Sequence, residues 1–115
     1  MKFTVYQFHM SDKVSDQVNK LGWDEAYKLY PEVKIQLDVK FSGGSKGYSD
    51  WMSEYYTPVC EIEADDLEEV FHIGNMGPEE RIKRLAPMHS VSVGDIVECD
   101  GTKHMVDGFG FAEIA

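Results

Sequence analysis

The feature that most constrains the fold is an Asp-Gly pair, Asp100-Gly101, which lies between two short segments suited to β-strands. These flanking segments are residues 95–99 and 102–106, and a further strand-like segment, residues 109–114, follows them. Asp-Gly in this setting is the strongest short-range signal for a β-hairpin, because a type I′ turn needs positive φ at both central residues. The C-terminal third is therefore predicted to be an antiparallel hairpin that continues as a meander.

Four more segments alternate apolar and polar residues with the period of a strand. They are residues 2–8, 33–41, 58–63 and 90–93. The alternation is strictest in residues 33–41, and it predicts an amphipathic strand with one buried face. Together with the hairpin, these segments supply enough strands for a sheet.

Short helices are expected between the first strands. Ser11 is a typical N-cap residue, apolar side chains follow it at helical spacing, and Gly22 provides a stop signal. Residues 23–30 and 50–56 are each expected to add one or two helical turns, and Pro31 is expected to end the first of these.

Two more helices are expected in the middle of the chain. Asp65 or Asp66 caps one that ends at residues 74–75, and a second begins at residues 77–78 and ends at Pro87. Both carry apolar residues at helical spacing, so each is predicted to pack one face against the sheet.

The glycine-rich segment 42–47 is predicted to be a flexible surface loop. It does not match the phosphate-binding P-loop pattern, because Lys46 precedes Gly47 and no Ser or Thr follows the lysine in register.

Strands and short helices mix along 115 residues without a repeat or a linker. This indicates a single compact α+β domain over residues 1–115, with a mainly antiparallel β-sheet, short helices and the C-terminal hairpin or meander. No apolar stretch approaches the roughly 20 residues that span a bilayer, and the first ten residues lack the layout of a signal peptide. A cytoplasmic protein that does not bind membranes is expected, with Cys60 and Cys99 as buried, reduced thiols.

Charge is uneven along the chain. The sequence has 21 acidic and 11 basic residues and a net charge of −10, and residues 50–80 contain acids but no base. Such a surface argues against direct nucleic-acid binding, which requires a basic face. The acids at residues 65–69 fit a helix start, where the helix dipole favours negative charge, but Glu61 and Glu63 have no such local reason.

One interpretation is a solvated acidic segment; the other is a contact surface in which acids steer a basic partner and aromatic rings supply area. The residues of this predicted surface are Trp51, Tyr55, Tyr56, Glu61, Glu63, Glu68 and Glu69.

Motifs for metal or nucleophilic chemistry are absent from the sequence. It has no EF-hand loop and no Cys-x-x-Cys or His-x-x-x-His pair, and Cys99 with His104 would supply only two ligands. No nucleophile motif surrounds Cys60 or Cys99. No metal and no cofactor are therefore expected, and the sequence favours a protein that is not an enzyme. The alternative is a small ligand-binding or hydrolytic site near the C-terminal turns, formed by His89, Asp95, His104 and Asp107.

Three segments follow one another in a recognisable order: L-E-E-V-F at residues 67–71, H-S-V-S-V-G-D-I-V at 89–97 and M-V-D-G-F-G-F at 105–111. This order resembles the YodL-like domain, which occurs in bacterial, mobile-element and phage proteins, and residues 67–114 form the YodL-like portion. The chain as a whole is similar to small proteins of marine bacteriophages. The resemblance brings no catalytic residues with it.

Within these segments, Asp95 and Asp107 are expected to bond backbone amides at turns. Phe109 and Phe111 are expected as buried rings of a hairpin core, with a binding pocket as the alternative. The leading functional hypothesis is a small acidic protein-binding or regulatory module that acts on a host protein, in the host cytoplasm if a phage encodes it. A nucleic-acid mimic that occupies a basic groove is a special case of it.

Overall fold

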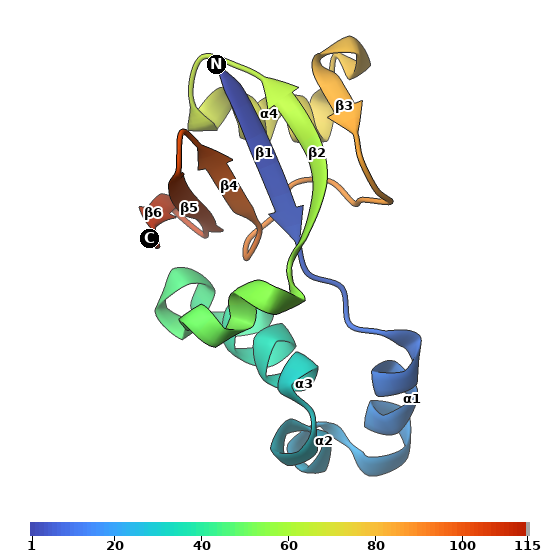
Figure 1. Cartoon of the computed structure of the whole chain (residues 1–115). Coiled ribbons are helices and arrows are strands. Elements are labelled where there is room, and N and C mark those ends of the chain that lie inside the picture. Colours follow the sequence, from blue (N-terminus) through green and yellow to red (C-terminus); the bar gives the residue numbers. More distant parts are fainter. Residues whose placement is uncertain (115) are drawn as a thin grey trace.

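A computed structural model describes residues 1–114; Ala115, the last residue of the predicted domain, lies outside the described residues. Six antiparallel strands form one sheet in the order β3-β2-β1-β4-β5-β6. Figure 1 shows α4 behind the sheet and the segment from α1 to the residues before β2 gathered at one end of it. The predicted α+β class with a mainly antiparallel sheet is confirmed.

The strands are β1 (Lys2–Gln7), β2 (Thr57–Glu63), β3 (Ile82–Arg84), β4 (Ile96–Cys99), β5 (Thr102–Asp107) and β6 (Gly110–Glu113). The α-helices are α1 (Asp12–Leu21), α2 (Trp23–Leu29), α3 (Pro31–Ile35) and α4 (Leu67–Met76). The other helical segments are the π-helix η1 (Gln36–Gly43) and the 3-10 helices η2 (Gly44–Gly47), η3 (Asp50–Tyr55) and η4 (Glu79–Arg81).

The two faces of the sheet pack against different partners. On one face, Phe3 and Val5 of β1 pack under Val70 and Ile73 of α4. On the other face, a second apolar cluster fills the space between the sheet and the helical segments η1 and η3, and its buried members are Phe8, Ile35, Val39, Met52, Tyr56, Ile96 and Met105. The helical segment between β1 and β2 is therefore fastened to the sheet by its own core.

The predicted hairpin and the first helix are confirmed. Asp100 and Gly101 have φ values of 52° and 84°, as a type I′ turn requires, and Cys99 pairs with Thr102 across them. Ser11 caps α1 by accepting a hydrogen bond from the Val14 amide, and Gly22 ends the helix.

The predicted strand at residues 33–41 is wrong, because this segment forms α3 and η1. As expected, α2 ends directly before Pro31, at Leu29 with Tyr30 as its C-cap. Pro31 also begins α3, at a position where its missing N–H is not needed. Ile35 and Val39 lie four residues apart and are both buried in the second cluster. Spacing of four residues fits a helical face, and this packing overrode the alternation.

The predicted loop at 42–47 is also wrong: these residues complete η1 and form η2. Residues 90–93 were expected as a strand, but they have no regular secondary structure.

The helix predicted after Gly77 is replaced by η4 and the strand β3, because Ile82 pairs with Ile62 and satisfies the open edge of β2. α4 runs past residues 74–75 to Met76 and ends at Gly77.

Candidate functional site

Asp107 locks two distant turns together. Its carboxylate accepts hydrogen bonds from the Ser45 backbone N–H (2.8 Å) and from the Ser45 hydroxyl (2.6 Å). Gly44 is buried beside it with φ of +53°, and a Cβ at this position would collide with the Asp107 carboxylate. The contact fixes η2 against the turn between β5 and β6, so these two elements keep a constant position relative to each other.

A hollow of about 510 Å³ lies between these elements and is called the aromatic hollow below. The η1–η2 segment contributes Lys40, Phe41 and Lys46, and the β5–β6 turn contributes Phe109 and Phe111. A volume of this size is within the range of natural binding pockets.

Two aromatic rings of this hollow are exposed to solvent. Phe109 is fully exposed and Phe41 is 62% exposed. The edge of the Phe41 ring lies against Trp23, with a centroid distance of 5.9 Å. The prediction that Phe109 is a buried core ring is wrong, because Gly108 and Phe109 form the two-residue turn itself and place the ring beyond the sheet.

Phe111 packs against the core under α4, as the sequence predicted for this ring, but it is half-buried and not fully buried. Beside it lies a smaller hollow of about 240 Å³, which Glu68, Phe71 and Val106 also line. The strand β6 therefore has an apolar hollow next to its α4 side and the aromatic hollow at its beginning.

The lining of the aromatic hollow contains two lysines and one carboxylate, that of Asp107, so its formal charge is positive by one. Within residues 1–114, none of the ion pairs involves Lys40 or Lys46. Lys46 is exposed, whereas Lys40 is half-buried with its Nζ 3.3 Å from Nε2 of His89. In a chain of net charge −10, this region stands out as one that favours an acidic group.

A buried amide, that of Gln7, holds the loop that leads into β4. Its Nε2 donates to the His89 carbonyl (2.9 Å) and to Oδ2 of Asp95 (3.0 Å), and its Oε1 accepts from the His89 N–H (3.2 Å). Oδ2 of Asp95 also accepts from the Ser92 N–H (2.9 Å). Sequence reasoning missed Gln7, because the alternating pattern of a strand marks it as a polar position and does not show that its amide is buried.

Asp95 is fully buried, and its Oδ1 has no hydrogen-bond partner among residues 1–114. Burial raises the pKa of the Asp95 carboxyl above its ordinary value, while the hydrogen bonds from Ser92 and Gln7 act in the opposite direction. The expected bond to a backbone amide is present. The carboxylate is enclosed, so it holds the loop and does not face a ligand.

His89 lies in a group of basic side chains. Its Nδ1 is 2.7 Å from the Ser90 carbonyl, so the Nδ1–H tautomer donates there and leaves Nε2 to accept from Lys40. The ring of His9 packs edge-on against it at 4.8 Å. Desolvation lowers the pKa of His9, and His89 and Lys40 add to this effect.

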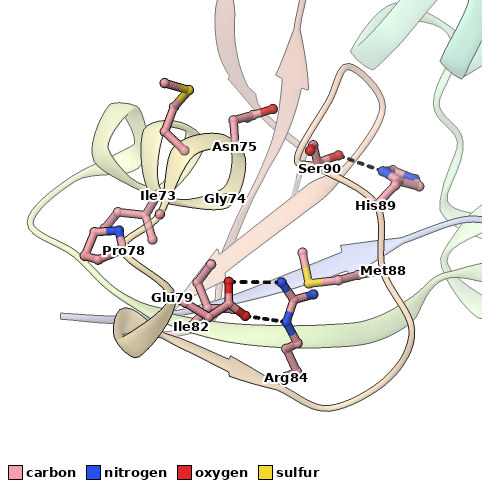
Figure 2. A pocket seen from close by; sticks show the side chains of 12 residues that line it. Ile73, Gly74, Asn75, Pro78, Glu79, Ile82, Arg84, Met88, His89 and Ser90 are labelled. Atoms are coloured by element: carbon pink, nitrogen blue, oxygen red, sulfur yellow. Dashed lines mark hydrogen bonds and ion pairs between the residues drawn. The ribbon is translucent and has the colours of Figure 1, made fainter.

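His89 also lines a hollow of about 410 Å³ beside the end of α4 (Figure 2). Figure 2 shows Arg84 paired with Glu79 along one side of this hollow, and the Arg84 Nε to Glu79 Oε1 distance is 2.6 Å. The guanidinium is thus already neutralised, which leaves this hollow without a free charge from Arg84.

The four residues of the predicted ligand site are not brought into one cleft. His89 and Asp95 are joined through Gln7, Asp107 lines the aromatic hollow, and His104 lies on β5 opposite Val97 and Glu113. No group of three or more His, Cys, Asp or Glu residues within residues 1–114 could hold a metal ion.

The aromatic residues of the predicted contact surface lie before β2, and its acids lie in the second half of that strand or beyond it. Trp51 is 44% exposed and packs edge-on against the half-buried Tyr55. Tyr56 is buried, its hydroxyl donates to the Gly94 carbonyl (2.6 Å), and burial raises its pKa. Tyr56 directly precedes β2, and Glu63 is the last residue of this strand. At roughly 3.3 Å per residue, the strand places Glu63 about 20 Å beyond its first residue.

Most of these acids meet bases. Glu61 lies between the amines of Lys2 (3.4 Å) and Lys83 (3.8 Å). The N-terminal amine contacts Glu63 (3.0 Å), Arg81 contacts Glu69 (2.9 Å), and Glu68 lines the smaller hollow. The structure therefore does not unite these acids and rings into one patch.

No family model, no curated protein and no solved structure matches this chain. The resemblance of residues 67–114 to YodL-like domains stays a prediction. No helix within residues 1–114 is long and apolar enough to cross a membrane.

Proposed function

We propose that the protein is a small protein-binding module that docks an apolar and acidic segment of another protein in the aromatic hollow. The observation that carries this proposal is the full exposure of Phe109 at the tip of a turn that Asp107 holds rigidly, with the exposed Phe41 lining the same hollow. Exposed aromatic rings beside a hollow are typical of interaction sites. If a phage encodes the chain, a host protein is the partner class we propose.

The rings supply binding energy of a useful size. A fully covered aromatic side chain buries about 150 to 250 Å², and each Å² of apolar surface is worth roughly 25 cal/mol. Covering Phe109 and the exposed part of Phe41 therefore contributes roughly 6 to 10 kcal/mol before the entropic cost of association. The fixed turn lowers that cost, because little ordering remains to be done on binding.

Charge selects the partner. Lys40 and Lys46 lie in the lining of the hollow, so a carboxylate next to the docked apolar side chain finds a complementary field. The acids around Glu61 and Glu63 are each close to a base, so they provide a weaker steering surface than their number suggests. The aromatic hollow therefore supports binding better than the acidic segment does.

Selection from a displayed library of random dodecapeptides tests this proposal. Immobilised protein is expected to enrich peptides that place Asp or Glu beside an aromatic or aliphatic residue, and Phe109→Ala is expected to lose most of the enrichment. Trp51→Ala is the matched control, since Trp51 is a partly exposed ring outside the hollow. Enrichment that is the same for wild type and Phe109→Ala would refute the proposal.

A charge variant separates steering from packing. Lys46→Glu is expected to weaken the selected peptides mainly at low salt, because the attraction is screened as ionic strength rises. Lys13→Glu makes the same charge change on the exposed start of α1 and is expected to have little effect. Equal effects of the two variants would show that net charge alone, and not this hollow, governs binding.

A further inference from the structure

We propose that the bound segment adds a seventh strand to the sheet by pairing with the free edge of β6. This inference rests on the proposed function, because the aromatic hollow supplies the side-chain contacts of the same segment. Figure 1 shows β6 at one margin of the sheet, with β3 at the other. Within residues 1–114, β6 pairs with β5 alone, so its second edge has no strand partner there.

The register identifies the groups on that open edge. The Ile114 N–H donates to the Lys103 carbonyl (2.9 Å), and Ala112 pairs with Met105. Hydrogen-bonded and non-bonded pairs alternate along an antiparallel ladder. The backbone N–H and C=O groups of Phe111 and Glu113 therefore point outward, where an added strand can bond to them.

The two edges of the sheet differ in their protection. β3 has three residues, and two of them, Lys83 and Arg84, are basic and exposed, which is a common way to block edge pairing. β6 reads Gly110-Phe111-Ala112-Glu113 and contains neither lysine nor proline. β6 is also short and carries the exposed Glu113, but it lacks the two basic residues that block β3, so it is the more open of the two edges.

Side-chain positions agree with a strand at this edge. On the α4 side, an added strand runs past Phe111 and the smaller hollow lined by Phe71, which takes an apolar side chain. Toward the beginning of β6, the strand reaches the aromatic hollow with Phe109 and Lys46, where an acidic side chain is favoured. One extended segment thus contacts both hollows through alternate side chains.

The charge of the chain indicates which molecule supplies this strand. A second copy carries the same net charge of −10, and like-charged molecules repel each other on approach. A partner segment with an acidic residue near Lys46 and apolar residues along β6 is therefore the occupant that we propose.

A proline at one outward position tests the strand pairing. Glu113→Pro removes the outward N–H but keeps the bonds of β6 to β5, and proline is tolerated on edge strands in this orientation. Glu113→Ala is the matched control, since it removes the side chain and keeps the N–H. Binding of a selected dodecapeptide, measured by fluorescence anisotropy, is expected to weaken about tenfold in Glu113→Pro and to stay near the wild-type value in Glu113→Ala.

Methylation of the peptide backbone gives an independent readout. N-methyl groups placed one residue at a time along the selected peptide are expected to weaken binding at every second position, because only alternate amides face β6. Circular dichroism melting of Glu113→Pro checks that the fold is kept; if it is lost, the methylation series decides.

The outcomes separate this inference from the proposed function. If Phe109→Ala abolishes binding but Glu113→Pro and N-methylation leave it unchanged, the hollow binds peptides and the strand pairing is wrong. If Phe109→Ala has no effect, the proposed function fails. A wild-type dimer in analytical ultracentrifugation that Glu113→Pro dissociates would also overturn the inference, since the occupant would be a second copy.

Discussion

Replacing the buried Gln7 with leucine is expected to destabilise the protein strongly. Gln7 is fully buried and makes two donated hydrogen bonds and one accepted one with His89 and Asp95. Each such bond contributes about 1 kcal/mol net, and groups left buried without a partner add a further penalty. After the gain from a buried leucine, we expect the free energy of unfolding to fall by about 3 kcal/mol.

Thermal unfolding followed by circular dichroism measures this loss. For a domain of this length, 1 kcal/mol corresponds to roughly 4 °C in Tm, so Gln7→Leu is expected to melt about 12 °C below wild type. Gln17→Leu makes the same chemical change on the half-buried surface of α1, and it is expected to shift the unfolding free energy by less than about 0.5 kcal/mol. The reasoning is refuted if the two variants melt together.

Hydrogen exchange locates the loss. The His89 and Ser92 amides donate to Gln7 and Asp95, so they are expected to exchange faster in Gln7→Leu than the amides of the β4–β5 hairpin. Uniform acceleration across the sheet would contradict the assignment of Gln7 as the residue that fastens this loop.

Three more predictions follow from the buried groups. Gly44→Ala is expected to lower the free energy of unfolding by about 1 to 3 kcal/mol and to weaken peptide binding, because the residue has positive φ and the added Cβ meets Asp107. Gly101→Ala is the control, since Gly101 also has positive φ but has open space around it; urea titration of this variant measures the cost of the backbone strain alone. Burial raises the pKa of Asp95, so the stability of wild type relative to Asp95→Asn is expected to fall as pH rises from below the ordinary carboxyl pKa to neutral. Urea unfolding at pH 3 and at pH 7 measures this difference in stability, and a difference that is the same at both pH values would contradict the prediction. Burial raises the pKa of both thiols, that of Cys60 to about 11, and Cys60 is fully buried whereas Cys99 is half-exposed. Cys99 is therefore expected to react first with a disulfide reagent at pH 8, and equal rates for the two thiols would contradict this.

Local signals predicted much of the fold. The Asp100-Gly101 turn and the caps of α1 are decided by residues next to one another in sequence, and both are confirmed. The prediction of a strand at residues 33–41 was wrong, because a short alternating segment also places Ile35 and Val39 on one helical face. Only the second cluster, built from distant parts of the chain, distinguishes the two conformations.

The candidate site was less predictable for the same reason. Asp107 was expected to bond amides of its own turn, but its partner is Ser45, 62 residues away. Phe109 follows a strand pattern in sequence, and only the register shows that it belongs to the turn. The glycines on both sides of Phe109 were the one local signal that could have marked it as a turn residue.

The unequal margins of the sheet also set a limit on assembly. Growth of a chain of copies by edge pairing needs two compatible edges on each molecule, one to accept and one to offer. Here the margin at β3 is short and basic, whereas the margin at β6 has no basic residue. Edge pairing between copies therefore joins β6 to β6 and ends at a pair, so it does not propagate into a fibre.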